Sequence, residues 1–248
     1  MSGTRDENIF MARLAEQAER YDDMCEYMKR AAMMGIELDL EERNLLSVAF
    51  KNSLGSVRQA WRVTVSDEQR LPHAAQWIRD YRARLEAELD SKCTEILAAL
   101  DTHLIPKTTD DEAKVFFMKM KGDYHRYHAE FQNEGGRAEA AGKAQAAYKD
   151  ALAQAETLLG PAHPMRLGLA LNYSVFFNEV LGQTQEAVQL ARGTLEAATG
   201  ALEGLDPERQ RESAQIMQLL SDNLQLWTSA AAADGKAPEL DGTAVEDL

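Results

Sequence analysis

KVFFMKMKGDYHRYHAEF, which spans Lys114–Phe131, carries an apolar stripe at the helical period. The stripe consists of Phe116, Met120, Tyr124, Tyr127 and Phe131, at spacings of 4, 4, 3 and 4 residues. Such spacing places all five side chains on one face of a helix. We therefore expect a helix here that packs this face against the rest of the protein.

A polar line runs beside this stripe, made of Lys119, Asp123 and Arg126. Asp123 stands one helical turn from each cation, so its carboxylate can hold both long side chains in place. Tyr127 follows Arg126 directly and can donate a phenolic hydrogen bond to the same oxygen as the guanidinium. Cations held in this way suit a phosphate, although a lysine or arginine on a helix more commonly just faces water.

Composition limits the classes of function. The chain has 248 residues, a hydrophobic content of 45%, a net charge of −14 and a pI of about 4.8. An acidic surface repels nucleic acid and anionic membranes, so neither is an expected partner. No apolar run approaches a membrane span or a signal peptide, and Cys25 and Cys93 lack a C-x-x-C partner. These features predict a soluble protein of the cytoplasm, or of the cytoplasm and the nucleus.

Prolines, glycines and capping residues divide the chain into about nine helices and predict an all-α fold. Asp39 with Glu42 has the spacing of a capping box, Thr109 with Glu112 is expected to cap the fifth helix, and Gly135-Gly136 to end it. The expected helices cover 4–34 (two helices), 40–70, 74–104, 110–133, an alanine-rich segment up to Gly160, 164–181, a segment from Thr184, and 207–229. We expect one domain over 1–230 and a disordered acidic tail over 231–248.

Three other expected helices place polar residues on one face. Lys51 and Arg58 lie seven residues apart, as do Asn172 and Glu179, and seven residues make two turns. The apolar neighbours of the asparagines are Leu171 and Val175 around Asn172, and Leu219, Leu226 and Trp227 around Asn223. Cations on one wall and apolar residues on the other predict an amphipathic groove for an extended peptide, whose backbone asparagine can hold. The alternative is that both asparagines are ordinary buried amides.

Four segments resemble the 14-3-3 family. They are RNLLSVAFKN at 43–52, the segment 114–127, HPMRLGLALN at 163–172 and MQLLSDNLQLW at 217–227. The resemblance covers roughly residues 5–229. It implies nine antiparallel helices in a cup-shaped protomer, a homodimer or a heterodimer with paralogues, and adaptor proteins that bind phosphoserine or phosphothreonine peptides of client proteins and regulate their activity, localisation or assembly.

The resemblance also implies roles for individual residues. Lys51, Arg58, Arg126 and Tyr127 correspond to the phosphate ligands, supported by Lys119 and Asp123. The peptide-groove residues that it implies are Leu171, Asn172, Val175, Glu179, Leu219, Asn223, Leu226 and Trp227. The dimer residues that it implies are Leu14, Arg20, Asp23, Tyr81, Arg84 and Glu88, with Arg20 facing Glu88 and Asp23 facing Arg84 across the interface.

Several positions depart from the family pattern. Val57 and Ser221 stand where many members have arginine, and Asn178 where many have tyrosine. None of these is a phosphate ligand, so the departures bear on which residues around the phosphate are preferred. Ala60 stands where many members carry a serine whose phosphorylation opens the dimer, so that control is expected to be absent.

Two other classes of protein compete with this interpretation. His125 and His128 stand three residues apart and could hold a metal, but no Glu-x-x-His, glycine-rich phosphate loop or nucleophile elbow accompanies them. We therefore expect no enzyme activity, no metal and no cofactor. A helical-repeat scaffold that binds unphosphorylated partners is the second alternative, although no motif recurs at a fixed period.

Overall fold

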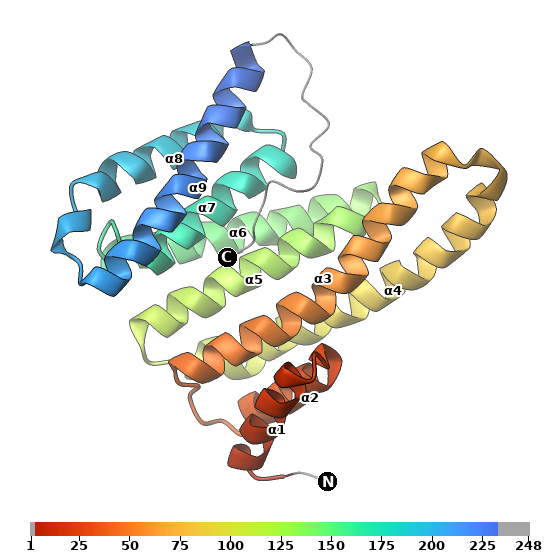
Figure 1. Ribbon diagram of the computed structural model, residues 1–248, viewed down its shortest axis with the longest axis horizontal. Coiled ribbons are helices and arrows are strands. Elements are labelled where there is room, and N and C mark those ends of the chain that lie inside the picture. The colour runs from red at the N-terminus through yellow and green to blue at the C-terminus, as the bar shows by residue number, and fades with distance from the viewer. Residues whose placement is uncertain (1–2, 233–248) are drawn as a thin grey trace. The chain divides into compact units, whose positions relative to one another are not determined.

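The protein is all-α, as the sequence predicts. The structure, a computed structural model, describes residues 3–232 (Figure 1). The nine α-helices of this range are α1 (Arg5–Gln17), α2 (Tyr21–Met33), α3 (Leu40–Arg70), α4 (Ala75–Ala99), α5 (Asp111–Phe131), α6 (Glu134–Leu158), α7 (Pro164–Glu179), α8 (Thr184–Thr199) and α9 (Pro207–Ala232). The predicted disordered tail beyond Ala232 lies outside the described residues.

The chain divides into two compact units, Met1–Arg137 and Ala138–Leu248. The first contains α1–α5 and the start of α6, and the second contains the rest of α6 with α7–α9. The domain predicted over 1–230 includes both units. Each unit has its own buried apolar side chains, and we describe the two separately.

The core of the first unit fixes α3 and α5, the two helices that carry the predicted phosphate ligands. Leu46 and Leu54 of α3, Leu89 of α4, and Phe117 and Tyr124 of α5 are almost fully buried in one cluster. The rings of Phe50 and Tyr124 meet edge to face with centroids 6.3 Å apart, which is a favourable aromatic geometry. The stripe predicted on α5 therefore packs inward and sets the rotation of that helix.

The core of the second unit joins α7 to α8 and α9. Leu171 and Val175 of α7, Ala191 of α8, and Leu220 and Trp227 of α9 are buried in one cluster. Aromatic rings add to this packing. Tyr173 stacks on Tyr148 of α6 at a centroid distance of 5.2 Å and on Phe177 at 4.4 Å.

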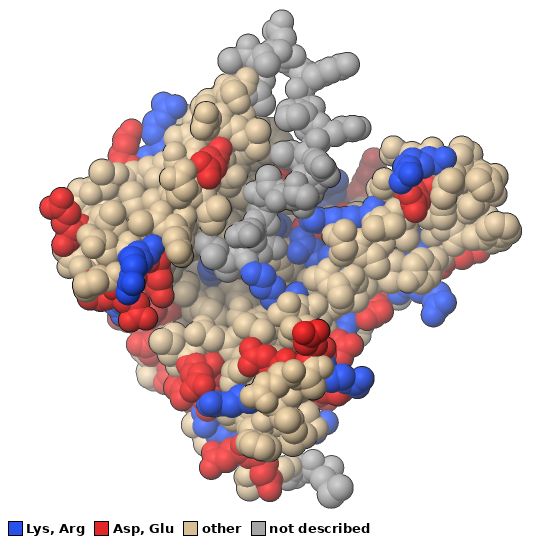
Figure 2. Space-filling model, in the orientation of Figure 1, with Lys and Arg blue, Asp and Glu red and all other residues tan. Residues whose placement is uncertain are grey.

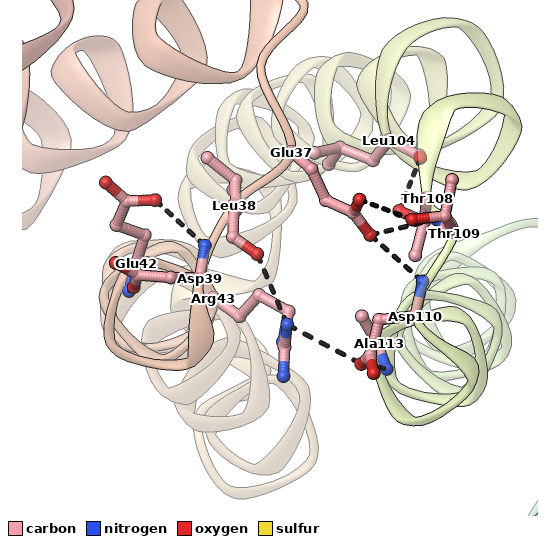
Figure 3. A network of polar contacts seen from close by, with 10 residues as sticks. All are labelled: Glu37, Leu38, Asp39, Glu42, Arg43, Leu104, Thr108, Thr109, Asp110 and Ala113. Atoms are coloured by element: carbon pink, nitrogen blue, oxygen red, sulfur yellow. Dashed lines mark hydrogen bonds and ion pairs between the residues drawn. The ribbon is translucent and has the colours of Figure 1, made fainter.

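The predicted capping box of α3 is confirmed. The Asp39 carboxylate accepts from the Glu42 backbone N–H at 2.9 Å, and the Glu42 carboxylate accepts from the Asp39 N–H at 2.9 Å (Figure 3). These bonds satisfy two backbone donors that an uncapped helix would leave without partners.

The predicted cap of α5 is wrong. Asp110 is the N-cap, and its carboxylate accepts from the Ala113 N–H at 2.8 Å. The Glu37 carboxylate, from the loop between α2 and α3, instead accepts from the Thr109 N–H at 2.9 Å, the Thr109 hydroxyl at 2.8 Å and the Asp110 N–H at 3.1 Å (Figure 3). These bonds hold the pKa of Glu37 below its usual value. Thr109 therefore binds Glu37, a residue distant in sequence, and does not cap α5.

The predicted end of α5 at Gly135-Gly136 is also wrong. The helix ends at Phe131, and both glycines lie in the first turn of α6. The Asn133 side chain accepts from the Gly136 N–H at 3.0 Å, which is the contact of an N-cap residue. A helix start at Asn133 therefore takes the place of the expected glycine stop.

Replacement of Asp39 tests the capping box. Asp39→Ala should lower the free energy of unfolding by about 1 kcal/mol, because the Glu42 backbone N–H at the start of α3 loses its side-chain acceptor. Urea unfolding measures the change. Asn44→Ala, at an exposed site one turn further along α3, is the control and should shift stability by less than about 0.5 kcal/mol. Equal effects of the two substitutions would contradict a capping role.

Candidate functional site

Two guanidinium groups from different helices share one aromatic ring. The Arg58 guanidinium carbon, on α3, lies 3.9 Å from the ring centroid of Tyr127, on α5. The guanidinium carbon of Arg126 lies 4.6 Å from the same centroid. Both distances are within the range of cation–π attraction. Both arginines therefore lie against the same ring, and Figure 2 shows basic side chains gathered in this part of the surface.

The Tyr127 ring is itself held from behind. Tyr124 meets it edge to face at a centroid distance of 5.4 Å and is almost fully buried. Burial raises the pKa of the Tyr124 phenol well above its usual value, so this residue stays neutral. The ring that carries the two arginines is therefore supported by the core of the first unit.

Asp123 organises the cations of α5. Its carboxylate accepts from the Lys119 ammonium at 2.9 Å and lies 3.7 Å from Nη2 of Arg126. Arg126 is only 2% exposed, and Lys119 and Asp123 are also buried. A buried cation is costly unless it is paired, so the Asp123 carboxylate offsets part of the cost of burying both basic groups.

Glu130 organises Arg58 in the same way, and the sequence analysis missed it. Its two carboxylate oxygens accept from Nε and Nη2 of Arg58 at 3.1 and 2.6 Å, in a bidentate pair. The Nη2 atom of Arg62, one turn after Arg58, lies 3.7 Å from the same carboxylate. Glu130 follows Arg126 by four residues, so the helical spacing that drew attention to Asp123 could also have indicated Glu130.

The charges of this cluster do not balance. The basic residues joined by these contacts are Arg58, Arg62, Lys119 and Arg126, and the acidic residues are Asp123 and Glu130. Four positive and two negative charges leave a formal charge of +2, on a chain whose net charge is −14. Lys51 is exposed on α3, two turns before Arg58. An excess of oriented cations with a phenol among them is suited to binding an oxyanion.

The peptide-groove residues predicted on α7 and α9 belong to the second unit. Asn172 and Asn223 are 1% and 8% exposed. Leu171, Val175 and Trp227 are buried around them, Leu219 and Leu226 are partly buried, and Glu179 is exposed at the end of α7. Two amides are therefore set into an otherwise apolar surface of helices.

The departures from the family pattern have identifiable surroundings. Val57 is buried in the core of the first unit, and Ser221 is exposed on α9. Asn178 accepts a hydrogen bond from the Thr184 hydroxyl at 2.9 Å, which ties the end of α7 to the start of α8. Ala60 is half-buried on α3.

The residues predicted at the dimer interface lie on α1, α2 and α4 or at their ends. Leu14 and Tyr81 are exposed, as is Arg84. Arg20 pairs with Asp23 of the same chain at 2.9 Å, and Glu88 lies 3.6 Å from Lys92. Four further large apolar residues of α1, α3 and α4 are exposed, and none of them was predicted at the interface: Phe10, Leu40, Val63 and Trp77.

The candidate metal ligand His128 has polar partners within the protein. His128 Nε2 lies 2.8 Å from Asp90 Oδ1 and 2.9 Å from Gln132 Nε2. Within residues 3–232, no group of three or more His, Cys, Asp and Glu residues is placed to hold a metal ion. Burial raises the pKa of Cys25 and of Cys93 to about 12, which makes both thiols poor nucleophiles. None of the described helices has the length and apolar character that a membrane crossing requires.

Comparison with known proteins assigns the family. Residues 11–228 match the family model described as 14-3-3 protein. Protein BMH2 of Saccharomyces cerevisiae is 48% identical over 242 residues, which are 95% of this chain and 89% of the relative. The 14-3-3-like protein GF14-C of Oryza sativa subsp. japonica is 49% identical over 239 residues, 94% of this chain and 93% of the relative. The 14-3-3 protein epsilon of Drosophila melanogaster is 48% identical over 245 residues, 97% of this chain and 92% of the relative.

These relatives cover nearly the whole chain. The family implies phosphorylated protein partners and dimerisation, and its members are adaptors without enzymatic activity. The family match therefore favours the adaptor over the helical-repeat scaffold. The chain belongs to the 14-3-3 family and is a phosphopeptide-binding adaptor protein.

Proposed function

We propose that the cation cluster of α3 and α5 is the phosphate-binding site of this adaptor. Lys51, Arg58 and Arg126 contact the phosphate of a phosphoserine or phosphothreonine, and the Tyr127 hydroxyl donates to the same group. Lys119 and Asp123 support the site from α5. The observation that supports this proposal is the shared Tyr127 ring, whose centroid lies 3.9 and 4.6 Å from guanidinium carbons of two separate helices.

The function is recognition without chemistry. A hydrogen bond to a charged group contributes about 1.5–3 kcal/mol net, so four ligands can separate a phosphorylated from an unphosphorylated peptide by a hundredfold or more. Asp123 and Glu130 fix the cations before the ligand arrives, which lowers the conformational entropy lost on binding. Discrimination therefore depends on arginines that are already oriented.

The second unit supplies the contacts to the peptide itself. Asn172 and Asn223 hold the backbone of an extended ligand, because a carboxamide both donates and accepts hydrogen bonds as a peptide group requires. The apolar residues around them contact ligand side chains: Leu171, Val175, Leu219, Leu226 and Trp227. Glu179 adds a charge at the end of α7. Sequence preference around the phosphate follows from these side chains and from Asn178 and Ser221.

We further propose a homodimer that acts on phosphorylated clients in the cytoplasm and the nucleus and controls their activity, localisation or assembly. A heterodimer with a paralogue would use the same surface. The exposed apolar residues of α1 and α4, among them Leu14 and Tyr81, supply the apolar part of the interface. Arg20, Asp23, Arg84 and Glu88 set its orientation through ion pairs. Two sites in one dimer raise avidity for doubly phosphorylated clients by about 10²–10⁴.

Calorimetry with a matched pair of peptides tests the phosphate site. The wild-type protein should bind the phosphoserine peptide at least about a hundredfold more tightly than the serine peptide. Lys51→Glu should abolish most of this difference, because it adds repulsion as well as removing a contact. Lys149→Glu, the same change at an exposed position of α6, should leave binding intact. Equal affinity of the wild type for both peptides would refute the proposal.

Asn223 gives a second test, because it should contact the ligand backbone and not the phosphate. Asn223→Ala should weaken the phosphopeptide by about tenfold, the value of one lost hydrogen bond of roughly 1.4 kcal/mol. The loss should be similar for phosphopeptides of different sequence, since every peptide presents the same backbone. A thermal melt checks that the variant is folded. An unchanged affinity, or a loss confined to one peptide sequence, would remove Asn223 from the site.

The dimer surface is tested by sedimentation. Leu14→Asp combined with Tyr81→Ala should convert the dimer into monomers, because a charge replaces apolar contact at the interface. Leu40→Asp, at an exposed apolar residue of α3 outside the proposed interface, is the matched control and should remain dimeric. A dimer that survives the double substitution would place the interface elsewhere.

A further inference from the structure

A cavity of about 190 Å³ that is open to solvent lies in the second unit and is lined by residues of α6, α7, α8 and the loop after α6, half of which are exposed. Apolar residues form much of its wall, among them Leu152 of α6, Pro161 of the following loop and Leu190 of α8. Its residues fall between positions 152 and 197, and none of them is a proposed contact for the phosphopeptide. The adaptor function therefore does not account for this space.

One oriented cation faces the cavity. Arg166, in the first turn of α7, lines the cavity and donates from Nη1 to the Leu159 carbonyl at 3.2 Å, which fixes its guanidinium. Glu156 also lines the cavity, with Oε1 at 4.0 Å from Nη2 of Arg166. The Arg166 side chain is 18% exposed and that of Glu156 is 55% exposed. The charge held deeper in the wall is therefore positive, and the carboxylate has room to move into solvent.

A glycine keeps one wall open. Gly193 lies in the interior of α8, where glycine destabilises a helix relative to alanine. A Cβ atom built at this position would meet nothing within 4 Å, so close packing does not require the glycine. Its φ does not lie in the left-handed region, so backbone geometry does not require it either. Gly193 is exposed and lines the pocket next to Thr194, so at this position α8 presents backbone without a side chain.

We propose that this cavity binds a small organic carboxylate with a body about the size of a benzene ring. The planar guanidinium of Arg166 matches a carboxylate in a bidentate pair, and the apolar wall receives the body of the ligand. The size is appropriate, since a cavity of about 150 Å³ in another protein takes up benzene. Apolar lining with a few placed polar groups is the usual make-up of a small-molecule site.

Benzoate is the probe for this proposal. The full-length protein is first saturated with phosphopeptide, so that the cation cluster of α3 and α5 is occupied. Benzoate binding is then followed by ligand-observed NMR. Benzyl alcohol and benzylamine test the need for the negative charge, and inorganic phosphate tests the need for the apolar body. We expect benzoate to bind, and the other three to bind at least about tenfold more weakly, by the value of one charge-assisted pair.

Substitutions at Arg166 and Gly193 test whether benzoate binds in this cavity. Arg166→Met should weaken benzoate about tenfold or more, and Arg166→Lys should recover part of the loss, because it keeps the charge without the planar fork. Gly193→Leu keeps Arg166 and fills the cavity, so it should abolish binding while helix α8 remains folded. Gly142→Leu is the matched control, since Gly142 also lies inside a helix with nothing within 4 Å of its Cβ position and does not line the cavity. All four variants should bind phosphopeptide as the wild type does.

The outcomes are distinct. Loss of benzoate in Gly193→Leu and Arg166→Met, with binding retained in Gly142→Leu, supports the site. The proposal is overturned by a wild type that does not bind benzoate, by binding that survives Gly193→Leu, or by benzylamine or phosphate binding as well as benzoate. A wild type that fails to bind phosphopeptide, with benzoate lost in both Gly193→Leu and Arg166→Met, would instead contradict the proposed adaptor site and leave the cavity assignment standing.

Discussion

The stacking of Arg58 and Arg126 on the single ring of Tyr127 is the contact on which the site depends. Cations repel one another, so two guanidinium groups share a ring only where carboxylates hold them. Glu130 holds Arg58 and Asp123 holds Arg126, while Tyr124 supports the ring from the core. The apolar packing of α3 and α5 therefore serves a specific purpose. It maintains an arrangement of charges that would not persist in water, and it does so before a ligand arrives.

The orientation of α5 and the start of α3 could be predicted from the spacing of residues in the sequence. The apolar stripe of Lys114–Phe131 predicts which side of α5 is buried, and the spacing of Asp39 and Glu42 predicts where α3 begins. Local capping patterns mislead where a residue distant in sequence competes for the same backbone group. Glu37 binds Thr109 and leaves Asp110 to cap α5, and Asn133 starts α6 before the glycines can end α5. Local capping rules cannot indicate such competition, because the competing partner is set by the tertiary structure.

The residues that were not predicted also have roles that depend on tertiary structure. Glu130 had a local signal in its helical spacing from Arg126, but its role depends on Arg58, which is 72 residues away in the sequence. Trp77 and Phe10 had no such local signal. A large apolar residue on a helix is ordinarily expected in the core, whereas these two are exposed. Gly193 is a third case. In the sequence it reads as a weak point in a helix, and only the surrounding space shows it as part of a cavity wall.

The cationic site of α3 and α5 should bind the doubly charged form of a phosphate. The most direct measurement is the ³¹P NMR titration of a phosphoserine peptide, free and bound to the protein. A free phosphoserine loses its second proton with a pKa of about 6. Nearby guanidinium groups favour the dianion, so the pKa of the bound phosphate should lie well below that of the free peptide. Affinity should decline as the pH falls below about 6, because the free peptide then takes up a proton that the bound peptide does not. A bound phosphate that titrates as the free peptide does would show that Arg58 and Arg126 do not contact it.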